Sequence, residues 1–396
     1  MSGIAKPRVS RPLRREPSGG EPSGGEPSGS APSGNAPAPA RVTFANWNEF
    51  QVELRRRIDE FLLRSGRPAR DSIRAYVKAV VVLTAFALFY CGLVFVAVGW
   101  WQGLLLAMCL GAAAAAIGMN IMHDGGHGSF SKRPWVNKLA AMTLDVVGGS
   151  SYIWSWKHGI FHHTYANIAG YDSDIDLGKL GRVSPHQPRY WYQRWQHWYL
   201  WPMYGVMAIR WHVYDDFRDL VRGRIGSRPF PRPTGRELAI LIGGKAAFFA
   251  LAFGIPACFH PLWVVIVFYG TVAFVLGTLL SVVFQMAHCV EGAAFPSPDK
   301  GSGRMTRAWA VHQVETTRDF IRHSRVRAWF LGGLNFQIEH HLFPRISHVN
   351  YAAISNLVED TCKEFGVHYT EHLSLWSGLV SHFRWLRRMG STNQAG

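Results

Sequence analysis

The sequence predicts an all-α integral membrane protein, with four transmembrane helices in two hairpins and a cytoplasmic helical cap that holds a histidine-rich metal site. Four long apolar segments carry almost no charge, and each is near the roughly 20 residues that a helix needs to cross a bilayer. Basic residues lie in the connections on one side of these segments and are missing from the connections on the other. Clustered histidines begin directly after the second segment and recur along the chain. Together these observations predict the fold class.

The chain has 396 residues and a formal net charge of +16. A charge of this sign and size suits either nucleic acid or anionic lipid as a partner. Arginines gather just before the first apolar segment, between residues 55 and 74, and again near the carboxyl end at 384–388. We therefore expect the lipid bilayer to be the partner, and no nucleic acid. The five cysteines are an odd number and fall partly in the apolar segments, so no disulfide framework is implied.

Two segments of different composition precede the first span. Residues 1–41 repeat Glu-Pro-Ser-Gly-Gly and contain almost nothing large and apolar, so we expect a disordered tail. Within residues 42–75, Phe50, Leu54 and Ile58 recur at near-helical spacing among arginines. This pattern is typical of a cytoplasmic amphipathic helix that lies on the membrane surface.

Residues 76–390 are predicted to form the membrane domain. Its spans are expected at about 76–101, 102–122, 238–259 and 262–287. The connections after the first and third spans, Gly99–Gly103 and Cys258–Pro261, carry no Lys or Arg, whereas the 122–236 loop is rich in both. The positive-inside rule therefore places both termini, the long loop and the metal site in the cytoplasm, with two short turns outside.

Three histidine clusters and one isolated histidine are the candidate metal ligands. In the third cluster Gln337, His340 and His341 stand at i, i+3 and i+4, so their side chains leave one face of a helix. The clusters and the histidine that ends the fourth span supply eight imidazoles, about right for two ions: His123, His127, His158, His162, His163, His288, His340 and His341. Imidazole suits iron, zinc, copper and nickel, so the residues alone leave the metal open.

Two further stretches are given no ligand role. The run from Asp172 to Gly178 departs from a calcium loop, because its glycine comes one place late and Val183 stands where a bidentate glutamate is needed. His312 and Gln313 are not predicted to be ligands, and the remaining isolated histidines are expected to be solvated or hydrogen-bonded.

The clusters resemble the three histidine boxes of the membrane-bound fatty acid desaturases, and are numbered box one (His123–His127), box two (His158–His163) and box three (Gln337–His341). The Gln-Ile-Glu-His-His form of box three is similar to the front-end subgroup. The resemblance implies that the eight histidines bind two iron ions and that dioxygen is a co-substrate. Gln337 stands where many relatives have a ninth histidine, which makes it a further ligand or a neighbour of one. Asp124 and Glu339 are then expected to orient the imidazoles.

The activity that the resemblance implies is the introduction of a cis double bond into a CoA-linked or lipid-linked acyl chain. The front-end members with a fused haem domain carry a His-Pro-Gly-Gly motif that is missing here, so we expect electrons from a separate carrier such as a ferredoxin or a haem protein. Two alternatives stay open. One is a di-iron lipid hydroxylase on the same scaffold, and the other is a non-catalytic membrane protein that binds metal or senses lipid.

Overall fold

A computed structural model describes residues 42–391, and the predicted disordered tail lies outside them. Four of its helical segments are long and apolar enough to cross a membrane, as expected: Ile73–Val96, Trp100–Gly126, Gly235–Ala257 and Leu262–His288. The first turn differs from the prediction. Helix α2 (Ile73–Cys91) continues through a π-helical turn to Val96, and α3 (Trp100–Ile117) begins directly after Gly99. The break lies before Trp100. Hydropathy does not mark this turn, because the residues on both sides of it are equally apolar.

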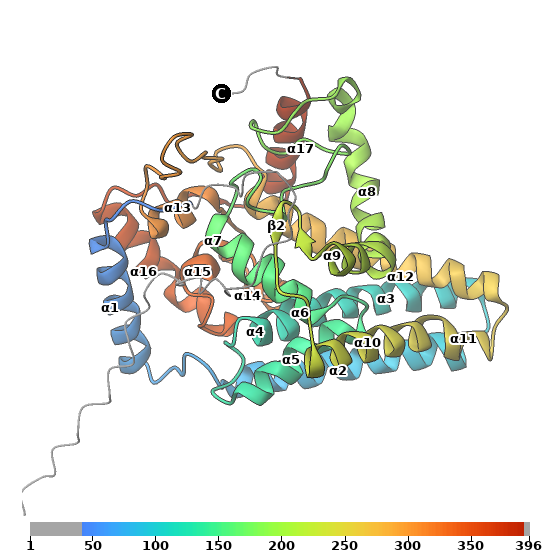
Figure 1. Ribbon diagram of the computed structural model, residues 1–396. Coiled ribbons are helices and arrows are strands. Elements are labelled where there is room, and N and C mark those ends of the chain that lie inside the picture. Colours follow the sequence, from blue (N-terminus) through green and yellow to red (C-terminus); the bar gives the residue numbers. More distant parts are fainter. Residues whose placement is uncertain (1–41, 392–396) are drawn as a thin grey trace, which may run out of the picture. The chain divides into compact units, whose positions relative to one another are not determined.

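The four spans pack as two hairpins (Figure 1). Helix α2 packs along α3, and α10 (Gly235–Phe249) leads through α11 (Ile255–Ala257) into α12 (Leu262–His288), which packs along α3. Small residues allow close helix contacts: a Cβ on Gly111 would lie 2.7 Å from the carbonyl oxygen of Val272. Helix α12 also packs against α8 (Gln196–Arg210), where a Cβ on Gly277 would lie 2.7 Å from the carbonyl oxygen of Gly205.

Short elements before, between and after the spans build the rest of the described chain. The helices are α1 (Glu49–Arg64), α4 (His123–Gly126), α5 (Pro134–Val146), α6 (Ser151–Trp154), α7 (His163–Tyr165), α9 (Asp216–Arg222), α13 (Trp309–Thr316), α14 (Arg325–Phe330), α15 (Gln337–Leu342), α16 (Tyr351–Glu364) and α17 (Leu375–Ser391). Strands β1 (Arg224–Ile225) and β2 (Arg228–Pro229) pair antiparallel, and β3 (Asp319–Phe320) and β4 (Glu371–His372) pair parallel.

The amphipathic helix is present as α1, but its apolar face is covered by protein. Phe50, Leu54 and Ile58 are buried in one cluster with residues of α13 and α16, including Ile354. Arg57 adds an ion pair from α1 to Glu364 on α16 (2.6 Å). This corrects the expectation that the helix lies on the membrane surface, because the apolar side chains that would enter lipid are used in packing.

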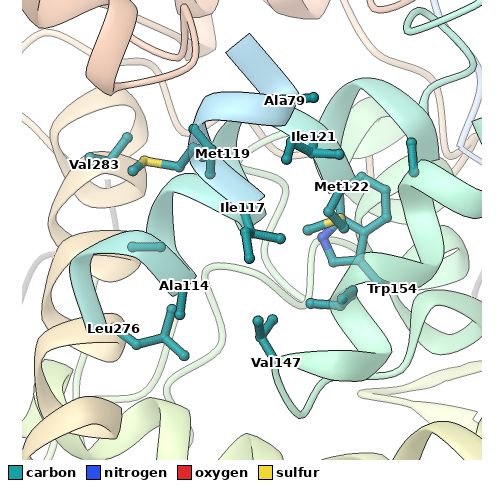
Figure 2. Close-up of a cluster of buried hydrophobic side chains, with 14 of the residues drawn as sticks. Ala79, Ala114, Ile117, Met119, Ile121, Met122, Val147, Trp154, Leu276 and Val283 are labelled. Atoms are coloured by element: carbon teal, nitrogen blue, oxygen red, sulfur yellow. The ribbon is translucent and has the colours of Figure 1, made fainter. Parts of the chain in front are cut away.

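An apolar cluster links the spans to the helices that carry the histidines (Figure 2). Ile117 and Met122 from the second span, Val147 after α5 and Leu276 from α12 all belong to it. Trp154 of α6 joins the same cluster and stacks on the His158 ring, with the centroids 4.7 Å apart. The packing of the spans therefore continues directly into the candidate site.

Candidate metal centre

All eight predicted histidines converge on one buried region. One nitrogen from each of four rings lies within 4.8 Å of the others in a first group, which comprises His123, His127, His158 and His340. A second group, defined by the same 4.8 Å limit between ring nitrogens, comprises His162, His288 and His341. His163 forms a further group with His340 and His341 and so lies between the two. The sequence regions that supply these rings are the end of the second span, the segment 155–163, the last residue of α12, and α15.

Neighbouring residues on two helices serve different groups. His340 and His341 are consecutive on α15, and their rings lie at 82° with centroids 5.4 Å apart. His340 therefore belongs to the first group and His341 to the second. The π-helical segment Ser155–His162 behaves similarly, because His158 lies in the first group and His162 in the second. Helix α15 and the segment Ser155–His162 thus both supply one histidine to each group.

Hydrogen bonds at Nδ1 orient three of these imidazoles. His158 Nδ1 donates to Asp174 Oδ2 (3.0 Å), and His162 Nδ1 donates to Asp172 Oδ2 (2.9 Å). His341 Nδ1 donates to the side-chain oxygen of Gln313 (2.8 Å). Such partners fix the tautomer with the proton on Nδ1, which leaves the lone pair of Nε2 for a metal.

Sequence reasoning did not assign these orienting roles. The aspartates were considered only as a calcium loop, and Gln313 only as a residue that is not a ligand. Both aspartates follow box two in a loop that folds back on it, and Asn167 holds the loop with φ +59° while its side-chain nitrogen donates to the carbonyl of His288 (3.1 Å). Only the structure reveals the role, because it shows the Asp172 carboxylate 1% exposed and therefore in need of a partner.

The two residues expected to orient imidazoles make other contacts. Asp124 accepts from the Ser347 hydroxyl (2.9 Å) and from His348 Nδ1 (2.9 Å), which joins box one to the chain that follows box three. The carboxyl group of Glu339 lies 3.0 Å from the hydroxyl of Tyr369, which donates to Asp319 Oδ2 over a shorter distance (2.6 Å). Burial, and then the neighbouring carboxylate of Asp319, raise the pKa of Glu339 well above its usual range. Within residues 42–391 neither carboxyl has a hydrogen bond to one of the eight histidines.

Gln337 lies beside the second group. Its side-chain nitrogen is 3.1 Å from Nε2 of His288, and both residues are buried. Whether Gln337 is a ligand or a neighbour of one stays a prediction, and the contact makes His288 the residue that it would neighbour.

Unpartnered imidazole nitrogens show that the residues fit metal ions. Among the eight predicted ligands, six have a buried Nε2 without a hydrogen-bond partner: His127, His158, His162, His163, His340 and His341. An unpaired buried nitrogen costs about 1–3 kcal/mol, so six that converge indicate a missing common partner. Burial lowers the pKa of His127, His163, His340 and His341 well below the usual value, which keeps these rings in the neutral form that binds metal. At His162 burial acts in the same direction, but the Asp172 carboxylate outweighs it and raises the pKa.

Comparison with known proteins gives the family. Residues 97–373 match the sequence profile of the family described as "Fatty acid desaturase", and this range includes all eight histidines. The chain belongs to the fatty acid desaturase family. The desaturase is 36% identical over 355 residues to an sn-1 linoleoyl-lipid 6-desaturase of Arthrospira platensis, a match that covers 88% of this chain and 95% of the relative.

Two further relatives carry similar names. The desaturase is 33% identical to an sn-1 linoleoyl-lipid 6-desaturase of Synechocystis sp., over 89% of this chain and 99% of the relative. It is 34% identical to an acyl-lipid (8-3)-desaturase of Physcomitrium patens, over 87% of this chain and 72% of the relative. The predicted resemblance to the family and its front-end members is thereby confirmed. The protein is an oxidoreductase of the membrane, and the relatives are not hydroxylases or non-catalytic metal binders by name.

Proposed function

We propose that this desaturase introduces a cis double bond into the acyl chain of a membrane lipid, with two iron ions held by the eight histidines and dioxygen as co-substrate. The observation that carries the proposal is the convergence of six unpartnered Nε2 atoms from separate parts of a desaturase-family chain. The names of the relatives support a lipid-linked substrate over a CoA-linked one.

The two groups of histidines define which residues would hold each ion. His123, His127, His158 and His340 would bind one iron, and His162, His288 and His341 the other, with His163 between them. Bound iron supplies the activation of dioxygen and the removal of hydrogen from two adjacent methylenes. The role of the protein is to orient the imidazoles through the Asp172, Asp174 and Gln313 contacts, and to bury the site away from water.

An apolar cavity of about 370 Å³ between the four spans is suited to the acyl chain. Its lining includes Leu110 and Ala114 from α3 and Ala273 and Leu276 from α12. Near the hairpin turns the lining includes His260, whose Nε2 donates to the carbonyl of Val94 (2.7 Å). The other end reaches the cluster around Trp154, which contacts box one and box two. A hydrocarbon chain fits this environment because it needs no polar partner, and holding it there would fix which carbons face the metals.

We further propose that both termini and the metal centre face the cytoplasm, where a separate acidic electron carrier reduces the enzyme. The asymmetry of Lys and Arg between the loops supports the orientation. The net charge of +16 supports an acidic partner, because complementary charge speeds docking.

Product analysis tests the proposed reaction. The enzyme would be expressed in a host that lacks related desaturases and fed defined fatty acids, and the host lipids would be analysed by gas chromatography with mass spectrometry. We expect a product two hydrogens lighter, at unchanged chain length, together with two irons per purified chain. A product heavier by one oxygen would indicate a hydroxylase instead. Bound metal without any dioxygen-dependent product would refute the enzymatic proposal.

A further inference from the structure

Helix α14 (Arg325–Phe330) presents an apolar face to the outside of the protein. Val326, Trp329 and Phe330 stand at i, i+3 and i+4, so they share one face, and they are 68%, 39% and 60% exposed. Arg325 and Arg327 flank this face in sequence, one on each side of Val326, and both are exposed. Neither arginine has an ion-pair partner in the part of the chain that the structure describes. Exposed aromatic residues between arginines are typical of a helix at a lipid interface.

Three contacts attach α14 to the ends of the first two spans. The Lys78 ammonium of α2 lies 5.1 Å from the centre of the Trp329 ring. The side-chain amide of Asn120, at the end of the second span, donates to the carbonyl of Phe330 (3.3 Å). Just after the helix, Gly332 has φ +64°, and a Cβ there would lie 2.1 Å from the carbonyl oxygen of Met119. Only glycine permits this approach, so α14 is held at the level where the spans leave the hydrocarbon.

The same contacts place α14 close to the metal centre. Asn120 precedes His123 by three residues, about one helical turn. On the other side, Phe330 precedes Gln337 of box three by seven residues. A lipid headgroup bound at α14 would therefore lie beside the centre, as an enzyme requires if it acts on carbons near the ester end of an acyl chain.

We propose that α14 is the docking surface for the anionic, phosphate-bearing headgroup of the acyl-lipid substrate. Arg325 and Arg327, one on each side of the apolar face, attract the anionic headgroup, since guanidinium groups bind phosphate oxygens well. Val326, Trp329 and Phe330 enter the outer part of the hydrocarbon and fix the depth of the helix. This inference rests on the proposed function, because it assigns the place where the lipid substrate of that reaction is recognised.

The test compares two substrates with the same acyl chain, one on phosphatidylglycerol and one on a neutral galactolipid. The detergent-solubilised, iron-loaded enzyme is assayed with dioxygen and a saturating reduced electron carrier. Under these conditions the double variant Arg325→Gln/Arg327→Gln should raise KM for the phosphatidylglycerol substrate on the order of tenfold, because each arginine contributes a favourable interaction with an anionic headgroup. Its kcat, its iron content and its KM for the galactolipid should stay unchanged. Arg384→Gln removes another exposed arginine, on α17, and should change none of these values.

Each other outcome overturns the assignment. Helix α14 does not bind an anionic headgroup if the double variant leaves KM for phosphatidylglycerol unchanged or raises KM equally for both lipids. The same conclusion follows if the unmodified enzyme turns over only the galactolipid. Turnover of neither lipid by the unmodified enzyme would refute the acyl-lipid function itself, and the assignment with it.

Discussion

Replacement of His288 by alanine tests whether this residue holds one of the two proposed irons. His288 is fully buried, and its ring centroid lies 4.6 Å from that of His162 and 4.9 Å from that of His341. Its loss leaves the second group with two imidazoles, fewer than a bound iron needs. We expect His288→Ala to retain one iron per chain and to lose more than about a hundredfold in activity, since even changes to groups outside the ligand shell commonly cost 10–100-fold.

Gln337→Ala separates a ligand from a neighbour. The variant keeps every imidazole and removes one contact of 3.1 Å, to His288. A neutral hydrogen bond contributes about 0.5–1.5 kcal/mol, which corresponds to a loss of about tenfold or less. Both irons should remain, and Gln337→His should keep them too, since imidazole is the better donor.

A buried histidine outside the site provides the matched control. His382 is fully buried, donates from Nδ1 to the carbonyl of Cys289 (2.7 Å) and accepts at Nε2 from the Tyr204 hydroxyl (2.8 Å). His382→Ala should lose about 1–3 kcal/mol of unfolding free energy for each partner left unpaired, yet keep two irons. Elemental analysis of the purified variants and lipid product analysis decide whether His288 is an iron ligand. Two irons and normal desaturation in His288→Ala would show that His288 is not a ligand.

Four further changes test other parts of the proposal. Asp172→Asn should weaken iron retention against a chelator by about 10–100-fold, because an amide orients His162 less firmly, whereas Asp176→Asn in the same loop should not. Ala273→Leu should shift the preferred substrate to shorter acyl chains at unchanged iron content, because it fills part of the cavity. Purified enzyme should need an added reduced carrier, and high salt should weaken that coupling through screening. Reporter fusions should lie outside at Gly99 and inside after Arg133, and the opposite result would refute the cytoplasmic orientation.

The spans and the histidine boxes could be predicted because both are local patterns. Apolar length identifies a span, and spacing at i, i+3 and i+4 identifies a shared face, whatever surrounds them. The surface covered by α1 could not be predicted, because the Phe50–Leu54–Ile58 pattern suits lipid and protein equally and the partner Ile354 lies far along the chain. The hydrogen-bond partners of the imidazoles could not be predicted from the sequence either, because they too lie apart from the histidines along the chain. Gln313 and His341 are 28 residues apart, and only the folded chain joins them.

The position of the boxes at the ends of spans explains how one chain can set both metal position and substrate register. Box one begins at His123, which continues the second span without a break, and His288 is the last residue of the fourth. These two spans pack along each other and also line the apolar cavity. In the proposed enzyme each group of histidines would take one ligand directly from a helix that lines the cavity for the acyl chain. A change in cavity depth would then move the acyl chain along the helices, whereas the proposed metal centre stays fixed to the same helices. Cavity substitutions should therefore alter which carbons react without altering iron content.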